Sequence, residues 1–301
     1  MRSLLNFLLS CFGRLIGKKF VDYKPGPANA FGRTAVKAKE GFWYVGNVLD
    51  KTDIAYGLLN NGVVEPEETK LVRKILKIIL QKGRLVFYDI GANTGYYGIL
   101  AAFMGKDRAK VYSFEPVTEH CECLKESVCL NRLEDSLEVF KLALSDSTGE
   151  QTFYLAGSGS SLNKEFLLGR QLETQNVKVA RLDDVVLEKE LFSPDFIKID
   201  VEGNEFNVLK GSEQVIKKAL PMLFVEIAYN LKAENKSFVN EYFEETFEFL
   251  RKLGYGAYTE GENGMEERGQ SAKPEGVKMY LFLHLEKHAE VLHELFKSPK
   301  L

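Results

Sequence analysis

The sequence predicts a mixed α/β fold, with a doubly wound, mostly parallel sheet of seven strands, a late antiparallel strand and an N-terminal extension. Two patterns carry this prediction. From residue 66 onward, short apolar runs alternate with amphipathic stretches of helical period. Several of the apolar runs end in an acidic residue or a glycine-rich turn. Strands that alternate with helices form parallel sheets with helices on both faces, joined by right-handed crossovers.

The composition is that of a globular protein of 301 residues, 45% hydrophobic and 28% charged. This length allows one large domain, or one domain with an extension. The formal net charge of -3 supplies no basic field for a polyanion, so nucleic acid is not expected as a partner. Three of the four cysteines fall in one predicted helix without the spacing of a zinc site, which favours reduced thiols in a cytoplasmic protein.

Residues 1–65 form the predicted N-terminal extension. Apolar residues recur at helical spacing over residues 1–16, which indicates an amphipathic helix. The run is too short to span a bilayer, and it lacks the basic start and the cleavage site of a signal peptide. We expect this helix to pack on the protein itself, with peripheral membrane contact or self-association as the alternatives. Prolines and glycines over residues 20–65 favour an irregular or short β segment.

The predicted domain, residues 66–301, opens with a helix. Pro66 suits a first helical position, and Gly83 ends the apolar face that follows it. The next run, LVFYDIG at residues 85–91, is continuously apolar in its first half, as a strand covered on both faces must be. A second helix is then expected to begin near Tyr96.

The same alternation continues to the end of the domain. A strand over 110–116 leads to a helix over 118–131, with Thr118 as the expected N-cap. A third strand is expected over 137–145, with QTFYL at 151–155 as its hairpin partner. Further strands are expected over 196–200, 222–228 and 277–285, and further helices over 205–220 and 242–253.

The most informative segment is the turn that follows the first strand of the domain. Asp89 stands at the carboxyl end of that strand, where open α/β sheets bind their ligands. Gly91 and Gly95 follow, and glycine lets the backbone approach a ligand closely or simply close a tight turn. Asn93 occupies the place where a dinucleotide site needs its second glycine, which argues against a nicotinamide-dependent oxidoreductase.

A second acidic residue, Glu115, ends the next strand in the run VYSFEP. An ionised carboxylate offers several acceptor sites and can therefore bind both hydroxyls of a ribose. Asp89 and Glu115 end neighbouring strands of the predicted sheet. Together they indicate a ligand that contains a nucleoside but no pyrophosphate.

These motifs resemble a known family. The residues DIGANTG at 89–95 and FEP at 114–116 resemble the first two motifs of class I S-adenosylmethionine-dependent methyltransferases. The runs LALSDSTG at 142–149, IKIDVEGNEFNVLKG at 197–211 and PMLFVEI at 221–227 make the resemblance specific to the FkbM family. The match runs from about residue 66 to residue 227, and it implies a Rossmann-like sheet.

The resemblance also implies a cofactor, S-adenosylmethionine, and a role for each matched residue. The methionine half of the cofactor would lie among the residues of the glycine-rich turn, Asp89, Gly91, Asn93 and Gly95. Glu115 would bind the ribose, with Pro116 beside it, and Ala143 and Leu144 would line the adenine slot. The implied acceptor is a hydroxyl of a sugar, a glycan or another small molecule such as a natural product.

A hydroxyl acceptor needs a group that takes its proton. The candidates are Asp200 and Glu202 in the run KIDVEGNE, and Glu226 at the end of the fifth strand. Glu205 is expected to interact with the N-terminus of its own helix instead. The three candidate carboxylates would also suit a divalent ion, but nothing in the sequence requires one, and we expect transfer without a metal.

Two other features have open interpretations. The loop AGSGSSLNKEF at residues 156–166 is expected either to fold over the acceptor or to be an ordinary surface connection. His120 is expected on an exposed helix face, and His288 and His293 on a solvated terminal helix, which leaves His284 as the histidine to test.

Two alternative functions remain at this point. The first is a methyltransferase acting on nucleic acid or protein, which the acidic composition and the lack of a basic, aromatic-rich stretch make less favoured. The second is a protein that binds S-adenosylmethionine without turnover. The intact pair of Asp89 and Glu115 and the acidic run KIDVEG argue against a decayed site.

Overall fold

The computed structural model describes residues 32–156, 159–164, 167, 173–228, 240–261, 264–268 and 279–297. The amphipathic helix expected over residues 1–16 lies outside these residues, and so does part of the loop at 156–166. Among the residues described, no helix is long and apolar enough to cross a membrane.

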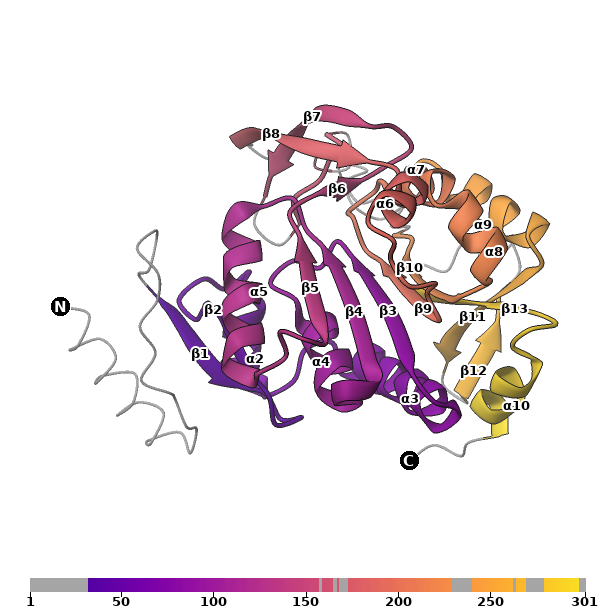
Figure 1. Ribbon diagram of the computed structural model, residues 1–301, viewed down its shortest axis with the longest axis horizontal. Helices are drawn as coiled ribbons and strands as arrows, with labels where there is room; N and C mark the ends of the chain where they lie inside the picture. Colours follow the sequence, from indigo (N-terminus) through magenta and orange to yellow (C-terminus); the bar gives the residue numbers. More distant parts are fainter. Residues whose placement is uncertain are drawn as a thin grey trace.

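The described residues form a large open sheet with the strand order β12-β11-β13-β10-β9-β3-β4-β5 (Figure 1). Five strands are parallel and form its centre and one edge: β3 (Leu85–Ile90), β4 (Ala109–Phe114), β5 (Leu137–Phe140), β9 (Phe196–Ile199) and β10 (Met222–Glu226). The late strand β13 (Met279–His284) is antiparallel to β10 and to β11 (Tyr255–Gly261). The predicted fold class is confirmed. Strand β11 and the short edge strand β12 (Gly264–Glu267) were not predicted, whereas the predicted strand over 151–155 lies outside this sheet.

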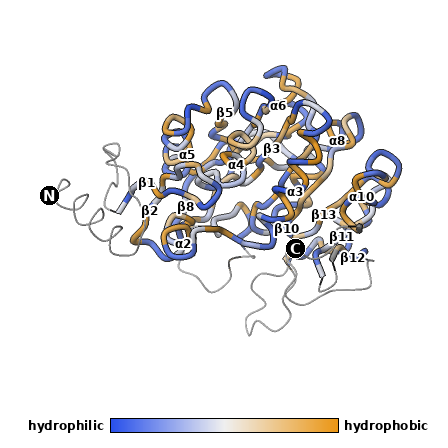
Figure 2. The backbone as a smooth tube through the Cα atoms, turned by 90° about the horizontal axis from the view of Figure 1, so that it is seen from below, coloured by the Kyte–Doolittle hydropathy of each residue, from blue (hydrophilic) through white to orange (hydrophobic). Residues whose placement is uncertain are grey.

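Helices cover both faces of this sheet, and each face has its own apolar core. One core contains residues of α3 (Pro66–Lys82), α4 (Tyr96–Gly105), α5 (Thr118–Asn131) and α10 (Ala289–Lys297). The other contains residues of α6 (Leu182–Glu188), α7 (Glu205–Gly211), α8 (Glu213–Ala219) and α9 (Phe243–Lys252). Neighbouring strand residues alternate between the two cores, Phe87 in the first and Tyr88 in the second, because side chains of a strand point to opposite faces. In Figure 2, apolar segments run through the middle of the molecule and hydrophilic turns lie at its periphery.

The described part of the N-terminal extension is a hairpin followed by a helix. Strands β1 (Arg33–Lys37) and β2 (Trp43–Asn47) pair antiparallel, and α2 (Ile54–Asn61) follows. Phe42 and Tyr44 belong to the same apolar core as α3 and α4. The Tyr44 hydroxyl also contacts the hydroxyl of Thr94 in the glycine-rich turn. The extension therefore packs directly against the turn that begins the site.

The third predicted strand, residues 137–145, is two strands in two sheets. Its first part is β5, at the edge of the large sheet, and its second part is β6 (Ala143–Leu144) in a small three-stranded sheet. In that small sheet β8 (Glu173–Ala180) lies between β6 and β7 (Gly149–Leu155). The prediction that 151–155 pairs with 137–145 is therefore wrong. The pairing with β8 buries Phe153, Val177 and Val179 together, a contact between distant residues that a local pattern does not reveal.

Two helix boundaries also differ from the prediction. Thr118 is the first residue of α5, and Val117 takes the N-cap position with no side-chain cap. The helix expected over 205–220 is two helices, α7 and α8, which meet at Ser212. Gly211, at the end of α7, lies so close to the chain after β6 that a Cβ atom there would be 1.9 Å from the carbonyl oxygen of Ser145. The break thus brings α7 against the small sheet.

Candidate functional site

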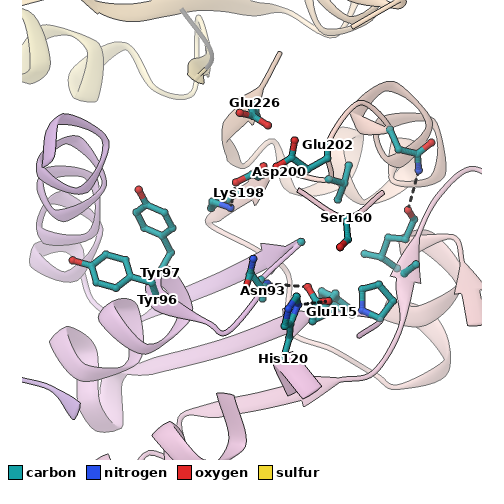
Figure 3. Close-up of a pocket in the computed structure, with 18 of the residues that line it drawn as sticks. Asn93, Tyr96, Tyr97, Glu115, His120, Ser160, Lys198, Asp200, Glu202 and Glu226 are labelled. Carbon is teal, nitrogen blue, oxygen red and sulfur yellow. Dashed lines mark hydrogen bonds and ion pairs between the residues drawn. The ribbon is translucent and has the colours of Figure 1, made fainter. Parts of the chain in front are cut away.

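A cavity of about 320 Å³ lies where the parallel strands β3, β4, β9 and β10 end (Figure 3). The strand order reverses between β3 and β9, and ligands of open α/β sheets bind at such a reversal. Residues at the carboxyl ends of the four strands line it, among them Gly91, Glu115, Asp200 and Glu226. Its walls come from three segments. The N-terminal extension supplies Thr52, Asp53, Ile54, Val64 and Glu65, the small sheet supplies Ala143, Leu144 and Phe153, and the loop after β7 supplies Ser160 and Leu162.

The turn after β3 has three residues in the left-handed region, Gly91 (φ 72°), Asn93 (φ 52°) and Gly95 (φ 88°). Gly91 and Asn93 line the cavity. Gly95 is the N-cap of α4 and faces away, because a Cβ atom on it would be 2.0 Å from Cδ1 of Leu124. Gly95 therefore has a packing reason to be glycine that is independent of any ligand.

Glu115 is nearly buried and directed toward the turn. One carboxylate oxygen accepts a hydrogen bond from the backbone N–H of Asn93 at 2.9 Å, and the other accepts one from the N–H of Val117 at 2.9 Å. His120 Nδ1 lies 3.2 Å from the second oxygen. Burial alone would lower the pKa of His120, but the hydrogen bond to Glu115 and the charge of Glu115 outweigh burial and raise it above its usual value.

Asp89 ends β3 directly beside β4, so it and Glu115 lie at the same edge of the sheet, as predicted. Its side chain is 1% exposed and lies beneath the turn instead of lining the cavity. Asp89 Oδ2 accepts a hydrogen bond from the N–H of Gly98 at 2.9 Å, and Oδ1 is 4.0 Å from Nζ of Lys198. Burial raises the pKa of Asp89 to about 6. Asp89 thus ties the end of β3 to the first turn of α4.

One side of the cavity is apolar. Ala143 and Leu144, the two residues of β6, are buried and line it. Phe153 of β7 and Pro116, which follows Glu115, extend the same wall. This apolar wall and the carboxylate of Glu115 belong to one end of the cavity.

The three candidate proton acceptors lie together in a second group. Carboxylate oxygens of Asp200, Glu202 and Glu226 are within 4.8 Å of one another, and all three residues are half-buried and line the cavity. Figure 3 shows them apart from Glu115 and His120. Burial, and then the charges of Asp200 and Glu202, raises the pKa of Glu226 well above its usual value. Carboxylates gathered this closely influence one another's protonation and could together bind a divalent cation.

Glu205 is not part of this group, in agreement with its expected interaction with the helix terminus. It is 1% exposed and begins α7. One of its oxygens accepts hydrogen bonds from the N–H groups of Val201 and Gly203 at 3.1 and 3.0 Å, and the other accepts one from Asn240 at 2.8 Å. Burial raises the pKa of Glu205 to about 7. Glu205 closes the turn that carries Asp200 and Glu202.

Described residues of the loop at 156–166 contact the same turn. Ser161 is fully buried, and its hydroxyl donates to the carbonyl oxygen of Glu202 at 2.6 Å. Asn163 Nδ2 donates to the carbonyl oxygen of Gly203 at 3.2 Å. Ser160 and Leu162 line the cavity. The described part of this loop is therefore a wall of the site.

Several lining residues were missed from the sequence. Lys198 lies inside an apolar strand. Because a buried charge is costly unless it is paired, a lysine at this position indicates a nearby carboxylate, and the sequence could have revealed it. His120 is half-buried against Glu115, so its expected exposure is wrong: the first turn of α5 passes beside the end of β4. Glu65 and Asp53 come from the extension, and no local pattern marks them.

The other histidines lie elsewhere. His284 ends β13 and does not line the cavity. His288 is 5% exposed and accepts a hydrogen bond from the N–H of His284 at 3.0 Å, so the expectation of a solvated His288 is wrong.

The strand order and the cavity at its reversal define an open, Rossmann-like α/β protein with a ligand site at the carboxyl ends of its strands. The model of the Methyltransferase FkbM domain matches residues 89–256, more than half of the chain. This chain belongs to the FkbM methyltransferase family.

Three relatives of this chain are named as methyltransferases. The hexuronic acid methyltransferase AglP of Haloferax volcanii is 26% identical over 158 residues, 51% of this chain and 61% of AglP. The 2-O-methyltransferase NoeI of Sinorhizobium fredii is 26% identical over 173 residues, 52% of this chain and 69% of NoeI. The 31-O-demethyl-FK506 methyltransferase FkbM of Streptomyces tacrolimicus is 28% identical over 166 residues, 44% of this chain and 61% of that protein. The chain thus spans less than two thirds of the length of AglP and of the Streptomyces protein.

Proposed function

We propose that this protein transfers a methyl group from S-adenosylmethionine to a hydroxyl of a sugar, a glycan or another small molecule. The observation that carries the proposal is the division of one cavity into two ends. Glu115 and an apolar wall form one end, and the carboxylates of Asp200, Glu202 and Glu226 form the other. Membership of the FkbM family supports the same conclusion.

The residues at the first end fit the cofactor. Glu115 can bind the two ribose hydroxyls, and the apolar pair Ala143 and Leu144 with Pro116 suits a flat adenine ring. Gly91 and Asn93 line the cavity where the methionine half of the cofactor would lie, and Asp89 ties the end of β3 to the first turn of α4. When bound, S-adenosylmethionine supplies a methyl group on a sulfonium, which an oxygen nucleophile displaces in line.

The residues at the second end suit a hydroxyl acceptor. Asp200 takes the proton of the hydroxyl, which makes the oxygen a better nucleophile. Glu226, whose pKa is raised by burial and by its neighbours, holds a proton and donates a hydrogen bond to the acceptor. Glu202 orients a further hydroxyl. In this proposal the carboxylates act without a metal, and holding the acceptor in line supplies much of the acceleration.

The acceptor class rests on the named relatives, each of which methylates an oxygen or a hexuronic acid by its name. A polyol ring offers several hydroxyls to a group of carboxylates. We further propose that the enzyme acts in the cytoplasm, which the free thiols of Cys121, Cys123 and Cys129 favour.

The test is methyl transfer from labelled S-adenosylmethionine to a panel of methyl glycosides of neutral hexoses, 6-deoxyhexoses and hexuronic acids. We expect label in at least one glycoside, and Asp200→Asn should lower turnover by roughly 10² to 10⁴, the range of general-base catalysis. Asp107→Asn, an exposed carboxylate far from the cavity, is the control. Tight binding of S-adenosylhomocysteine with no labelled product on any glycoside or on a glycan extract would favour the protein without turnover instead.

A further inference from the structure

A buried lysine lines the cavity beside Asp200 of the acceptor end. Lys198 is the third residue of β9, and only 4% of it is exposed. In the sheet it pairs with Asp89 of the neighbouring strand β3, so the two side chains point to the same face. Asp200 follows two residues later on that face. The alternation of the strand thus places one cation between two carboxylates.

The contacts of Lys198 are unequal. Its Nζ is 2.9 Å from Oδ2 of Asp200 and 4.0 Å from Oδ1 of Asp89. The ammonium also lies over the ring of Tyr97, 5.3 Å from its centre. Figure 3 shows Lys198 next to Asp200 and facing the side of Tyr97. The direct hydrogen bond therefore goes to the carboxylate that lines the cavity.

The surroundings of this pair are rich in acidic groups. Asp89 faces it from β3, Glu65 and Tyr97 from the side of α3 and α4, and Glu202, Glu205 and Glu226 from the turn and from β10. Burial alone would lower the pKa of Lys198, but the charges of Asp200 and Asp89 outweigh burial and raise it. Lys198 is thus a fixed positive charge among carboxylates that compete for protons.

We propose that Lys198 is a positioning residue whose buried ammonium keeps Asp200 ionised and fixed at the acceptor end of the cavity. Asp200 and Glu226 repel each other when both are ionised, so one of them takes up a proton. Since Lys198 bonds to Asp200, the proton goes to Glu226. This inference rests on the proposed function, and it gives the physical reason why Asp200 rather than Glu226 acts as the base.

The test is the titration of the Asp200 carboxyl carbon by ¹³C NMR in the complex with S-adenosylhomocysteine. Lys198→Met should raise the pKa of Asp200 by at least one unit, and Lys198→Arg should leave it nearly unchanged. Arg33→Met is the matched control, because Arg33 is also buried and paired with two carboxylates, Glu122 and Glu126, away from the cavity. An Asp200 that titrates alike in the native and Lys198→Met proteins would overturn the proposal.

Removal of Lys198 leaves Asp89 buried without its cation, and this variant risks misfolding. The second comparison is therefore Asp89→Asn/Lys198→Met against Asp89→Asn, with the same expected shift of Asp200. Turnover of the labelled glycoside is an independent measurement. Lys198→Met should lower kcat at least tenfold in the native protein. In the Asp200→Asn protein, the same substitution should cause no further loss of kcat. Additive losses would overturn the proposal. Unchanged turnover in Asp200→Asn alone would instead refute the base role of Asp200 in the proposed function.

Discussion

The carbonyl oxygen of Asp200 lies directly against Gly91, so close that a Cβ atom on Gly91 would be 1.8 Å from it. These two residues follow the neighbouring strands β3 and β9. The contact joins the turn of the proposed cofactor end to the turn of the proposed acceptor end. The distance between the two halves of the site is therefore set by backbone contact.

Gly91→Ala should destroy this contact. The new methyl group overlaps the Asp200 carbonyl, and the left-handed backbone at φ 72° costs an alanine about 1 to 2 kcal/mol besides. We expect loss of S-adenosylhomocysteine binding by isothermal titration calorimetry and a lower melting temperature. Gly57→Ala is the control, because nothing lies within 4 Å of a Cβ atom at Gly57 in α2. Native-like binding by Gly91→Ala would show that the two turns move apart freely.

Glu115→Ala should weaken binding at the cofactor end and leave the acceptor end unchanged. The variant removes the acceptor for the ribose hydroxyls and also the partner of the Asn93 and Val117 N–H groups. Hydrogen bonds to a charged group contribute about 1.5 to 3 kcal/mol, so the Kd of S-adenosylhomocysteine should rise by roughly 10- to 150-fold. Glu119→Ala, an exposed carboxylate in the first turn of α5, should leave the Kd unchanged. Equal affinity in Glu115→Ala would remove the ribose assignment.

The interaction of His120 with Glu115 predicts a pH dependence of stability. The pKa of His120 is raised in the folded protein, so the fold binds the proton more tightly than the unfolded chain does. This stabilisation is fully present below the unfolded pKa of about 6.5, and it is lost as the pH rises through the higher folded pKa. In chemical denaturation at a series of pH values across this range, the free energy of unfolding of the native protein should fall as the pH rises through the folded pKa of His120. In His120→Gln this fall should be missing. An identical pH profile in both proteins would contradict the assignment.

Much of the site could be predicted because parallel strands end at one edge of a sheet. Asp89, Glu115, Asp200 and Glu226 each lie at or next to the carboxyl end of such a strand, and local sequence is enough to place them at the same edge of the sheet. The position of Asp89 beneath the turn was not predictable in this way. It depends on the hydrogen bond to Gly98 in the next helix, which a strand pattern does not contain.

The remaining parts depend on contacts between distant segments. Glu65 reaches the cavity because its carboxylate accepts a hydrogen bond from the Tyr97 hydroxyl at 2.7 Å, 32 residues later. The pairing of β7 with β8 spans a loop, so its partner could not be read from the turn at 147–149. Tertiary packing also sets the rotation of α5 about its axis. That rotation places His120 beside Glu115 at the end of β4.

Ser161→Ala should reduce turnover without a matching loss of cofactor affinity. Glu202 has φ 55°, an unfavourable conformation, and the Ser161 hydroxyl donates a hydrogen bond to its carbonyl oxygen. The lost hydrogen bond is worth about 1 kcal/mol, so we expect kcat to fall by roughly fivefold as the turn loosens. Ser147→Ala, at an exposed turn, is the control. The measurement is steady-state methyl transfer together with the Kd of S-adenosylhomocysteine, and a rise in Kd with unchanged kcat would place Ser161 at the cofactor end instead.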